Sequence, residues 1–259
     1  MRRDSPLYTI CFATLVCGIC SVLVSSSAVG LRDRQRANQI LDRQLKVLSV
    51  AGLVQPGERL SRTEIERRFR ERIQPKVVVL ASGAYDESAD PETFDQQRAA
   101  RDPSTSRRAP DNPARVMRLP NQALVYLVME NNTVVQIVLP VEGMGLWSTL
   151  YGFLALDKDT TTIRGLTFYE HAETPGLGGE VDNPRWKALW EGRKAYDADW
   201  TPRIEVIKGQ AGPPATDPHH VDGLSGATMT SRGVSHLLQF WLGDDGFGPY
   251  LKRFREEGA

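Results

Sequence analysis

Beyond residue 20 the 259-residue sequence contains no cysteine. Its three cysteines, Cys11, Cys17 and Cys20, lie together in an apolar N-terminal run. The rest of the chain therefore has no disulfide framework, no cysteine-based zinc site and no thiol nucleophile. Net charge is missing as well, because 32 Lys and Arg residues balance 32 Asp and Glu residues. This balance argues against a nucleic acid partner and against general attraction to an anionic membrane surface.

The common cofactor signatures are also absent. The glycines of Glu173–Glu180 (ETPGLGGE) do not have the spacing of a dinucleotide-binding fingerprint, and no Lys-Ser or Lys-Thr follows them as in a Walker loop. Of the four histidines, His219 and His220 are adjacent, so on a strand they would face opposite ways. No third ligand is arranged with them, and we expect no metal site.

One long apolar run is present. No charged residue lies between Ser5 and Leu31, and Leu7–Val24 is mostly apolar. At about 1.5 Å per residue this run is long enough to cross a hydrocarbon core of about 30 Å. A cleaved signal peptide, with Ser26–Ala28 as the small-residue site, is the alternative. We favour a retained anchor because helical spacing continues beyond the apolar run. Arginines flank both ends of the run, so charge does not set the orientation of the anchor in the membrane.

The next 90 residues predict helical structure, either a stalk or a helix docked on the domain, and then a polar loop. Ser61–Glu64 is a capping box, which predicts a helix with Ile65, Phe69 and Ile73 on its apolar face. Residues 83–120 are rich in Asp, Arg, Ser and Pro, which predicts a long surface loop with one short helix near residues 92–100.

The second half of the chain is strand-like. Asn131-Asn132 is typical of a hairpin turn, and the connections are too short for parallel crossovers, so we expect a mainly antiparallel sheet. Asn183 and Pro184 predict the start of a short helix, which Gly192 would end. The expected strands are Leu124–Met129, Val134–Leu139, Tyr151–Leu156, Thr161–Phe168 and Ile204–Ile207.

The expected fold is therefore α+β, with one N-terminal transmembrane helix, a mainly antiparallel sheet and flanking helices. We divide the chain into an N-terminal tip and anchor at residues 1–32, a stalk and polar loop at 33–122, and a binding domain at 123–259.

The stretch DGLSGATMTS, residues 222–231, contains four hydroxyl side chains. The apolar residues that follow are spaced as in an amphipathic helix, with Thr230 or Ser231 as the expected N-cap. One cap does not account for four hydroxyls. The exposed N–H groups and positive dipole at a helix start favour a phosphate, which a threonine could hydrogen-bond or carry covalently.

These residues resemble a known family. Asp222–Thr228 resembles the flavinylation motif of the FMN-binding domain family, in which the last threonine is esterified to the FMN phosphate, and ETPGLGGE lies about fifty residues upstream. The stretches at residues 143–148, 152–156 and 240–249 resemble the C-subunit family of sodium-translocating NADH:quinone oxidoreductases.

The resemblance implies specific roles. Thr228 would carry the FMN, Asp222 matches the motif's acid, and Glu173 would hold the glycine-rich loop. From position alone we place Trp147 near the flavin ring or in the core, and Lys208 near the phosphate or in solvent. The residues expected to shape the phosphate turn or to line the isoalloxazine are Ser225, Gly226, Ala227, Thr230, Thr174, Leu177 and Gly178.

The resemblance further implies an electron-carrying subunit of a membrane complex that couples NADH oxidation and quinone reduction to sodium export. A flavin transferase would attach FMN taken from FAD, and the flavin domain would lie on the periplasmic side of the inner membrane. Two alternatives stay open: a component similar to the G subunit of an Rnf-type ferredoxin:NAD oxidoreductase, and an anchored flavin-binding sensor or interaction domain.

Overall fold

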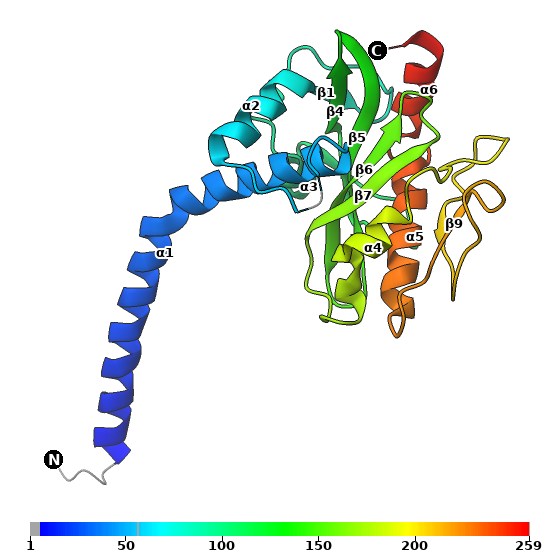
Figure 1. Cartoon of the computed structure of the whole chain (residues 1–259). Helices are drawn as coiled ribbons and strands as arrows, with labels where there is room; N and C mark the ends of the chain where they lie inside the picture. The colour runs from blue at the N-terminus through cyan, green and yellow to red at the C-terminus, as the bar shows by residue number, and fades with distance from the viewer. Residues whose placement is uncertain (1–5, 56, 259) are drawn as a thin grey trace. The chain divides into compact units, whose positions relative to one another are not determined.

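The computed structural model describes residues 6–55 and 57–258, and these divide into two compact units, one up to Asp42 and one from Arg43 onward. Helix α1 (Pro6–Val50) forms the first unit, and its last turns begin the second (Figure 1). It is long and apolar enough to cross a membrane, and none of its most apolar window is buried. The continuous helix confirms the predicted continuation of helical structure beyond the apolar run, and its last turn, with Val47, Leu48 and Val50, is buried.

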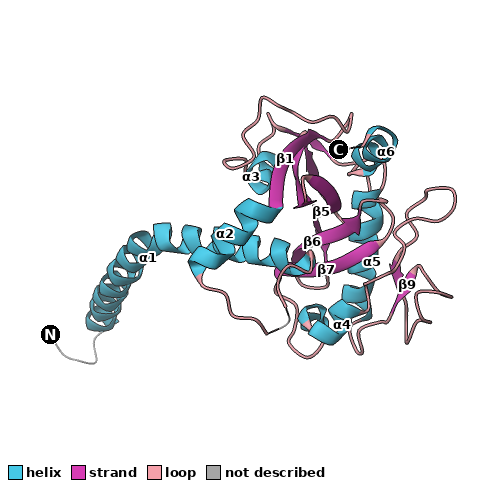
Figure 2. Ribbon diagram, turned by 45° about the horizontal axis from the view of Figure 1, so that its top comes forward, coloured by secondary structure: helices cyan, strands magenta, loops and turns pink. Residues whose placement is uncertain are grey.

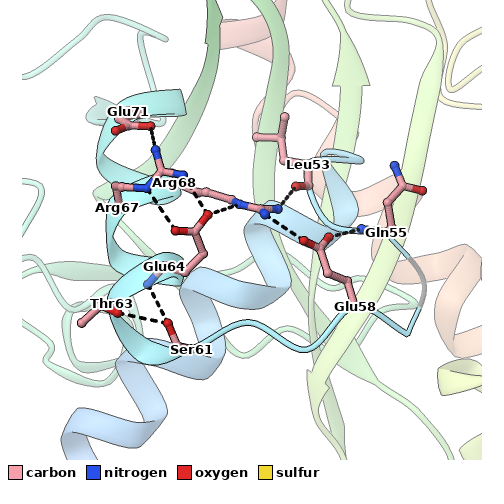
Figure 3. Close-up of polar contacts among 9 residues, drawn as sticks. All are labelled: Leu53, Gln55, Glu58, Ser61, Thr63, Glu64, Arg67, Arg68 and Glu71. Atoms are coloured by element: carbon pink, nitrogen blue, oxygen red, sulfur yellow. Dashed lines mark hydrogen bonds and ion pairs between the residues drawn. The ribbon is translucent and has the colours of Figure 1, made fainter.

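Helix α2 (Arg62–Arg72) begins as its capping box predicts, because Ser61 Oγ accepts a hydrogen bond of 3.3 Å from the Glu64 N–H. Arg68 then fastens the preceding loop to this helix (Figure 3). Its guanidinium donates to the Leu53 carbonyl at 3.2 Å and pairs with Glu58 at 2.7 Å and Glu64 at 2.8 Å. The loop that follows α1 and helix α2 are thereby joined by one side chain.

The predicted apolar face of α2 is one residue too long. Ile73 has extended backbone angles and begins strand β1 (Ile73–Val79), which follows the helix without a loop. This strand was not predicted, because Pro75 interrupts a pattern that is otherwise apolar and because its partner strand, β4, lies about fifty residues further along the chain. The proline is tolerated because β1 is the edge strand of the sheet, with β4 as its neighbouring strand; beyond Pro75, Val77 and Val79 also bond to Asp86 and Ala84.

A five-stranded antiparallel sheet forms the centre of the second unit, in the order β1-β4-β5-β6-β7. Asn131 and Asn132, both with positive φ, make the tight turn between β4 and β5 that the sequence predicts. These observations confirm the expected fold class. The four strands after β1 are β4 (Gln122–Glu130), β5 (Thr133–Met144), β6 (Thr149–Asp157) and β7 (Ile163–Glu170).

Helices cover both faces of the sheet (Figure 2). Helix α5 (Thr228–Leu242) packs on one face, where Gly143 of β5 leaves room for Leu237. On the other face, Arg43 at the end of α1 lies over the Tyr169 ring, beside helix α3 (Gln96–Arg101). The apolar core lies mainly under α5, and this fixes the helix start beside the strand ends.

The remaining elements are short and adjust several predictions. The polar segment 83–120 holds α3, shorter and later than expected, with Asp95 as its N-cap, and a small antiparallel pair. The predicted strand at 204–207 is only two residues long and pairs in parallel with a second short strand. These short elements are β2 (Ser106–Arg108), β3 (Arg118–Pro120), β8 (Glu205–Val206) and β9 (His220–Val221).

Three further helical segments complete the chain. Helix α4 (Pro184–Ala188) begins at its Asn183 cap as predicted but ends well before Gly192. A 3-10 turn, η1 (Gly178–Asp182), follows the glycine-rich loop, and α6 (Gly248–Glu257) closes the described chain.

Candidate functional site

Thr228 is the first residue of α5 and its side chain is exposed. Within the described ranges its hydroxyl makes no hydrogen bond. The predicted N-cap at Thr230 or Ser231 is wrong: the N-cap is Ala227, three residues before Thr230, and it provides no side-chain cap. Both predicted cap residues are buried inside the first turn. The Thr230 hydroxyl donates to Glu173, and the Ser231 hydroxyl accepts from the Leu224 N–H. Of these three hydroxyls, the one on Thr228 is therefore left available for chemistry.

The first turn of α5 presents unpaired backbone donors. The N–H groups of Thr228, Met229 and Thr230 have no acceptor in the part of the chain that the structure describes, as expected for the first three residues of a helix. Together with the positive end of the helix dipole they favour an anionic group beside Thr228.

Asp222 orders the turn that leads to this helix. Its Oδ1 accepts a hydrogen bond of 2.9 Å from the Ala211 N–H, and its carbonyl accepts one of 2.9 Å from Trp186 Nε1. The next residue, Gly223, donates its N–H to the Gly209 carbonyl at 2.8 Å. These bonds tie the motif to residues 207–211, on the opposite side of a cleft.

The cleft has a volume of about 720 Å³ and contains Thr228 in its wall. Ser225 and Gly226 of the motif line it, and Gly226 has φ +72°, a conformation that suits glycine. Two cations also line it, Lys208 from the predicted set and Arg232, which was not predicted, together with the acidic residues Glu205 and Asp222. Arg232 lies one helical turn after Thr228, so the i, i+4 spacing could have revealed it.

Glu173 joins three segments of the site. It is 5% exposed, and its Oε1 accepts backbone hydrogen bonds from residues 146–148, the shortest being 2.9 Å from the Trp147 N–H. Its Oε2 accepts a 2.6 Å hydrogen bond from Thr230 Oγ1. The β5–β6 turn, the glycine-rich loop and the first turn of α5 therefore meet at one carboxylate.

The environment keeps this carboxylate ionised. Burial by itself raises the pKa of Glu173, but hydrogen bonds from Thr230 and from three backbone N–H groups outweigh it, and the pKa lies below its ordinary value. Glu173 is therefore an anion at neutral pH.

The glycine-rich loop packs tightly around Glu173. A Cβ on Gly178 would lie 2.6 Å from both Glu173 Oε2 and Thr230 Oγ1, so no larger residue fits there without movement. Leu177 donates its N–H to the Thr174 carbonyl at 3.1 Å, and its side chain reaches the motif, where a Cβ on Gly226 would lie 2.9 Å from Leu177 Cδ2. The predicted loop and motif residues thus lie together.

Exposed apolar side chains surround these loops. Trp147 is 67% exposed, which excludes the core position considered for it, and its neighbour Leu146 is also exposed. Leu177 of the loop and Met229 of α5 are exposed as well. Large apolar side chains on the loops of one site are typical of a surface that binds a flat ring or another protein. Leu146 and Met229 were missed because single exposed apolar residues carry no sequence signal.

Three of the four histidines make contacts in and around the loops, and the fourth, His236, lies in α5. His171 contacts Asp182 at 2.9 Å, His219 contacts the Lys194 carbonyl at 2.9 Å, and His220 contacts Asp217 at 2.6 Å. Among residues 6–55 and 57–258, no group of three or more His, Cys, Asp or Glu side chains is arranged to hold a metal ion.

Comparison with known proteins places the site in context. Residues 145–243 match the model of the FMN-binding domain. The C subunit of the Na(+)-translocating NADH-quinone reductase of Pseudomonas aeruginosa is 46% identical, covering 100% of this chain and 99% of that protein. The protein of the same name from Yersinia pestis is 44% identical, over 98% of this chain and 95% of its own. The crystal structure of Shewanella oneidensis NqrC superposes with a TM-score of 0.77 at 33% identity, covering 86% of this chain and 100% of that one.

Proposed function

Since this chain belongs to the C-subunit family of the Na(+)-translocating NADH-quinone reductase, we propose that it carries FMN covalently on Thr228 and relays electrons within that complex. The observation that carries the proposal is the position of Thr228. Its hydroxyl is exposed, has no partner among the described residues and stands at a helix N-terminus in a cleft that two cations line.

The residues present fit the phosphate of FMN. The N–H groups of the first turn of α5 would donate to its oxygens, and the helix dipole favours its charge. Lys208 and Arg232 line the same cleft and would offset the remaining negative charge. Ser225 and Gly226 would let the phosphate approach the backbone closely, because neither side chain is bulky.

The apolar loops fit the ring system. Leu177, Trp147 and Met229 offer exposed apolar surface, and Thr174 adds a hydroxyl within the same loop. Glu173 would not touch the phosphate. It holds the two loops and α5 in register through its four hydrogen bonds, so the surface is formed before the cofactor arrives.

Attachment requires a second enzyme, which we propose is a flavin transferase that uses FAD. Thr228 Oγ1 forms a bond to the phosphorus on the riboflavin side of FAD, the P–O–P linkage breaks, and AMP leaves. The threonine proton is released to a base or to solvent. No electron changes hands, and the exposed hydroxyl is reachable by a modifying enzyme.

When bound, FMN would supply the redox chemistry, and the chain would position it and exclude competing reactions. A covalent phosphodiester prevents loss of the cofactor between reduction and oxidation, which suits an electron relay. The electrons would pass between other subunits of a complex that oxidises NADH, reduces quinone and exports sodium.

We further propose that α1 anchors the chain in the bacterial inner membrane, with the flavin domain on the periplasmic side. The length and apolar character of α1 support the anchor. Its flanking arginines do not choose between the two orientations.

The test is expression of the full chain with and without a flavin transferase, followed by a denaturing gel under ultraviolet light. Fluorescence should appear only with the transferase, and should vanish in Thr228→Val but persist in the matched variant Thr230→Val. A folded wild-type chain that stays dark with an active transferase, or a Thr228→Val chain that still fluoresces, contradicts the proposal.

A further inference from the structure

A second cavity lies on the sheet face opposite α5, at the end of β5 and β6. It has a volume of about 220 Å³ and includes Met144 and Thr149, the last residue of β5 and the first of β6. The turn between these two residues is the one that donates three N–H groups to Glu173. The cavity is therefore separated from the proposed flavin site by a single turn of the chain.

Arginines dominate the charge of this cavity. Arg101, Arg115 and Arg118 line it, and the guanidinium of Arg118 is engaged by Ser106, at 2.8 Å from its hydroxyl and 2.9 Å from its carbonyl. Neither Arg101 nor Arg115 forms an ion pair within the described part of the chain, and both residues are exposed, although Arg101 also makes a side-chain hydrogen bond with Tyr151 of the cavity wall. Two guanidinium groups therefore lack a carboxylate partner.

Glu142 is the single carboxylate that lines the cavity, and it does not neutralise these arginines. Within residues 6–55 and 57–258 its side chain makes no hydrogen bond and no ion pair. Burial raises the pKa of Glu142 to about 7, with Arg101 partly opposing the rise, so a large fraction of it is uncharged at neutral pH. With three arginines against this one carboxylate, the cavity carries net positive charge in either protonation state of Glu142.

The loop that presents Arg115 has a fixed conformation. Arg115 has φ +55°, unusual for a side chain of this size, and its N–H donates to the Asn112 carbonyl at 3.2 Å. The Asn112 side chain closes the turn by bonding both the N–H and the carbonyl of Val116, at 3.0 and 2.9 Å. Ala114 accepts from the Met144 N–H at 2.8 Å, which fastens the loop to β5.

Met117 follows on the rim and is 77% exposed, the highest exposure of any large apolar side chain among the described residues. An exposed methionine beside two arginines that lack a carboxylate partner is a combination that protein interfaces favour, since Met and Arg are enriched there. A small free ligand would give no reason for the apolar rim.

We propose that this cavity is a docking site for another subunit of the membrane complex, which inserts an Asp or Glu side chain between Arg101 and Arg115 and packs apolar surface on Met117. Charge complementarity selects the carboxylate, which a guanidinium binds through paired N–H groups. The inference rests on the proposed function only in requiring a multisubunit complex. Docking here would bring the partner close to the turn that carries Trp147, which is where electrons would leave or enter.

The experiment reconstitutes full-length chain variants with complex purified from a host that lacks this protein. The complex is captured through a tag on one of its other subunits, and the bound chain is quantified by immunoblot across a concentration series. The test pair is Arg101→Gln with Arg115→Gln. The matched control is Arg98→Gln with Arg108→Gln, which removes the same charge from exposed residues of the same segment outside the cavity.

We expect the cavity pair to weaken association at least tenfold and to reduce its dependence on salt, while the control pair stays within twofold of wild type. The proposal is overturned if the cavity pair and the control pair associate with the complex equally well, or if both lose association to the same extent. Met117→Asp, at a position too exposed to disturb folding, should also weaken association several-fold. The proposal is also overturned if both Met117→Asp and the Arg101→Gln, Arg115→Gln pair associate as tightly as the wild type.

Two further outcomes separate this proposal from others. If sodium acetate at millimolar concentration binds the isolated wild-type chain and leaves assembly unchanged, the cavity is a small-molecule site and the docking proposal fails. Immunoblot detection does not depend on FMN, so failure of flavin attachment and failure of docking are distinguished within one preparation.

Discussion

Thr230→Val removes one hydroxyl and keeps the shape of the side chain, so it measures the hydrogen bond to Glu173 almost in isolation. Thr230 is completely buried and Glu173 is 5% exposed, and water cannot readily replace the lost donor. Hydrogen bonds to charged groups contribute about 1.5–3 kcal/mol, so the free energy of unfolding should fall by roughly that amount. The matched control is Thr228→Val, two residues earlier on the same helix. Its hydroxyl is exposed and has no partner among the described residues, so its loss should change stability by less than about 0.5 kcal/mol.

The assay is urea unfolding of the full chain in detergent, followed by tryptophan fluorescence, with all variants prepared without flavin. The pH dependence gives a second readout. The pKa of Glu173 is lowered in the folded state, so the stability that it contributes is present above its unfolded pKa and is lost as pH falls through the folded value. Without the Thr230 hydroxyl the folded pKa rises toward the unfolded one. As pH falls, Thr230→Val should therefore lose less stability than the wild type, and that loss should be complete at a higher pH. Equal unfolding free energies for the two valine variants would refute the role given to Glu173.

Three other outcomes follow from the structure. Glu142→Gln should be more stable than wild type by up to about 3 kcal/mol at pH 8 and nearly equal to it at pH 4. Folding raises the pKa of Glu142 from 4.5 to about 7, each pKa unit is worth about 1.36 kcal/mol, and the wild type therefore loses stability as pH rises from 4.5 through 7. Parallel urea titrations of the two chains check this, and equal pH profiles would contradict it. Gly178→Ala should lower the free energy of unfolding by about 1–3 kcal/mol in the same assay, because the added Cβ would lie 2.6 Å from Glu173 Oε2 and Thr230 Oγ1. An unchanged free energy of unfolding would contradict this tight packing and mean that the loop moves readily. Arg68→Ala should accelerate trypsin cleavage after Arg59 several-fold relative to Arg70→Ala, since Arg68 holds Leu53 and Glu58 while Arg70 is exposed without an ion pair among the described residues.

Local patterns predicted the elements whose causes are local. The capping box at Ser61, the Asn131-Asn132 turn and the Asn183 cap are each complete within a few residues of sequence, and the structure confirms all three. The start of α5 was misplaced because Ala227 begins the helix through backbone geometry, with no side-chain cap to mark it. Strand β1 was missed because its partner strand is β4, about fifty residues away.

The same distinction applies to the site. The motif that ends at Thr228 is contiguous, so a resemblance could locate it. The Glu173–Thr230 hydrogen bond joins residues 57 positions apart, and only the packing of α5 on the sheet brings them together. Asp222 is a comparable case: its bond to the Ala211 N–H depends on how a loop folds back, which no spacing rule predicts.

The most direct test of covalent flavinylation is peptide mass mapping of the chain expressed with a flavin transferase. Trypsin cleavage after Lys208 and Arg232 releases one peptide that contains Ser225, Thr228, Thr230 and Ser231 together. We predict that this peptide gains the mass of FMN less one water, and that fragmentation places the addition on Thr228. An unmodified peptide from a chain that carries flavin, or an addition on any of the other three hydroxyls, would contradict the account.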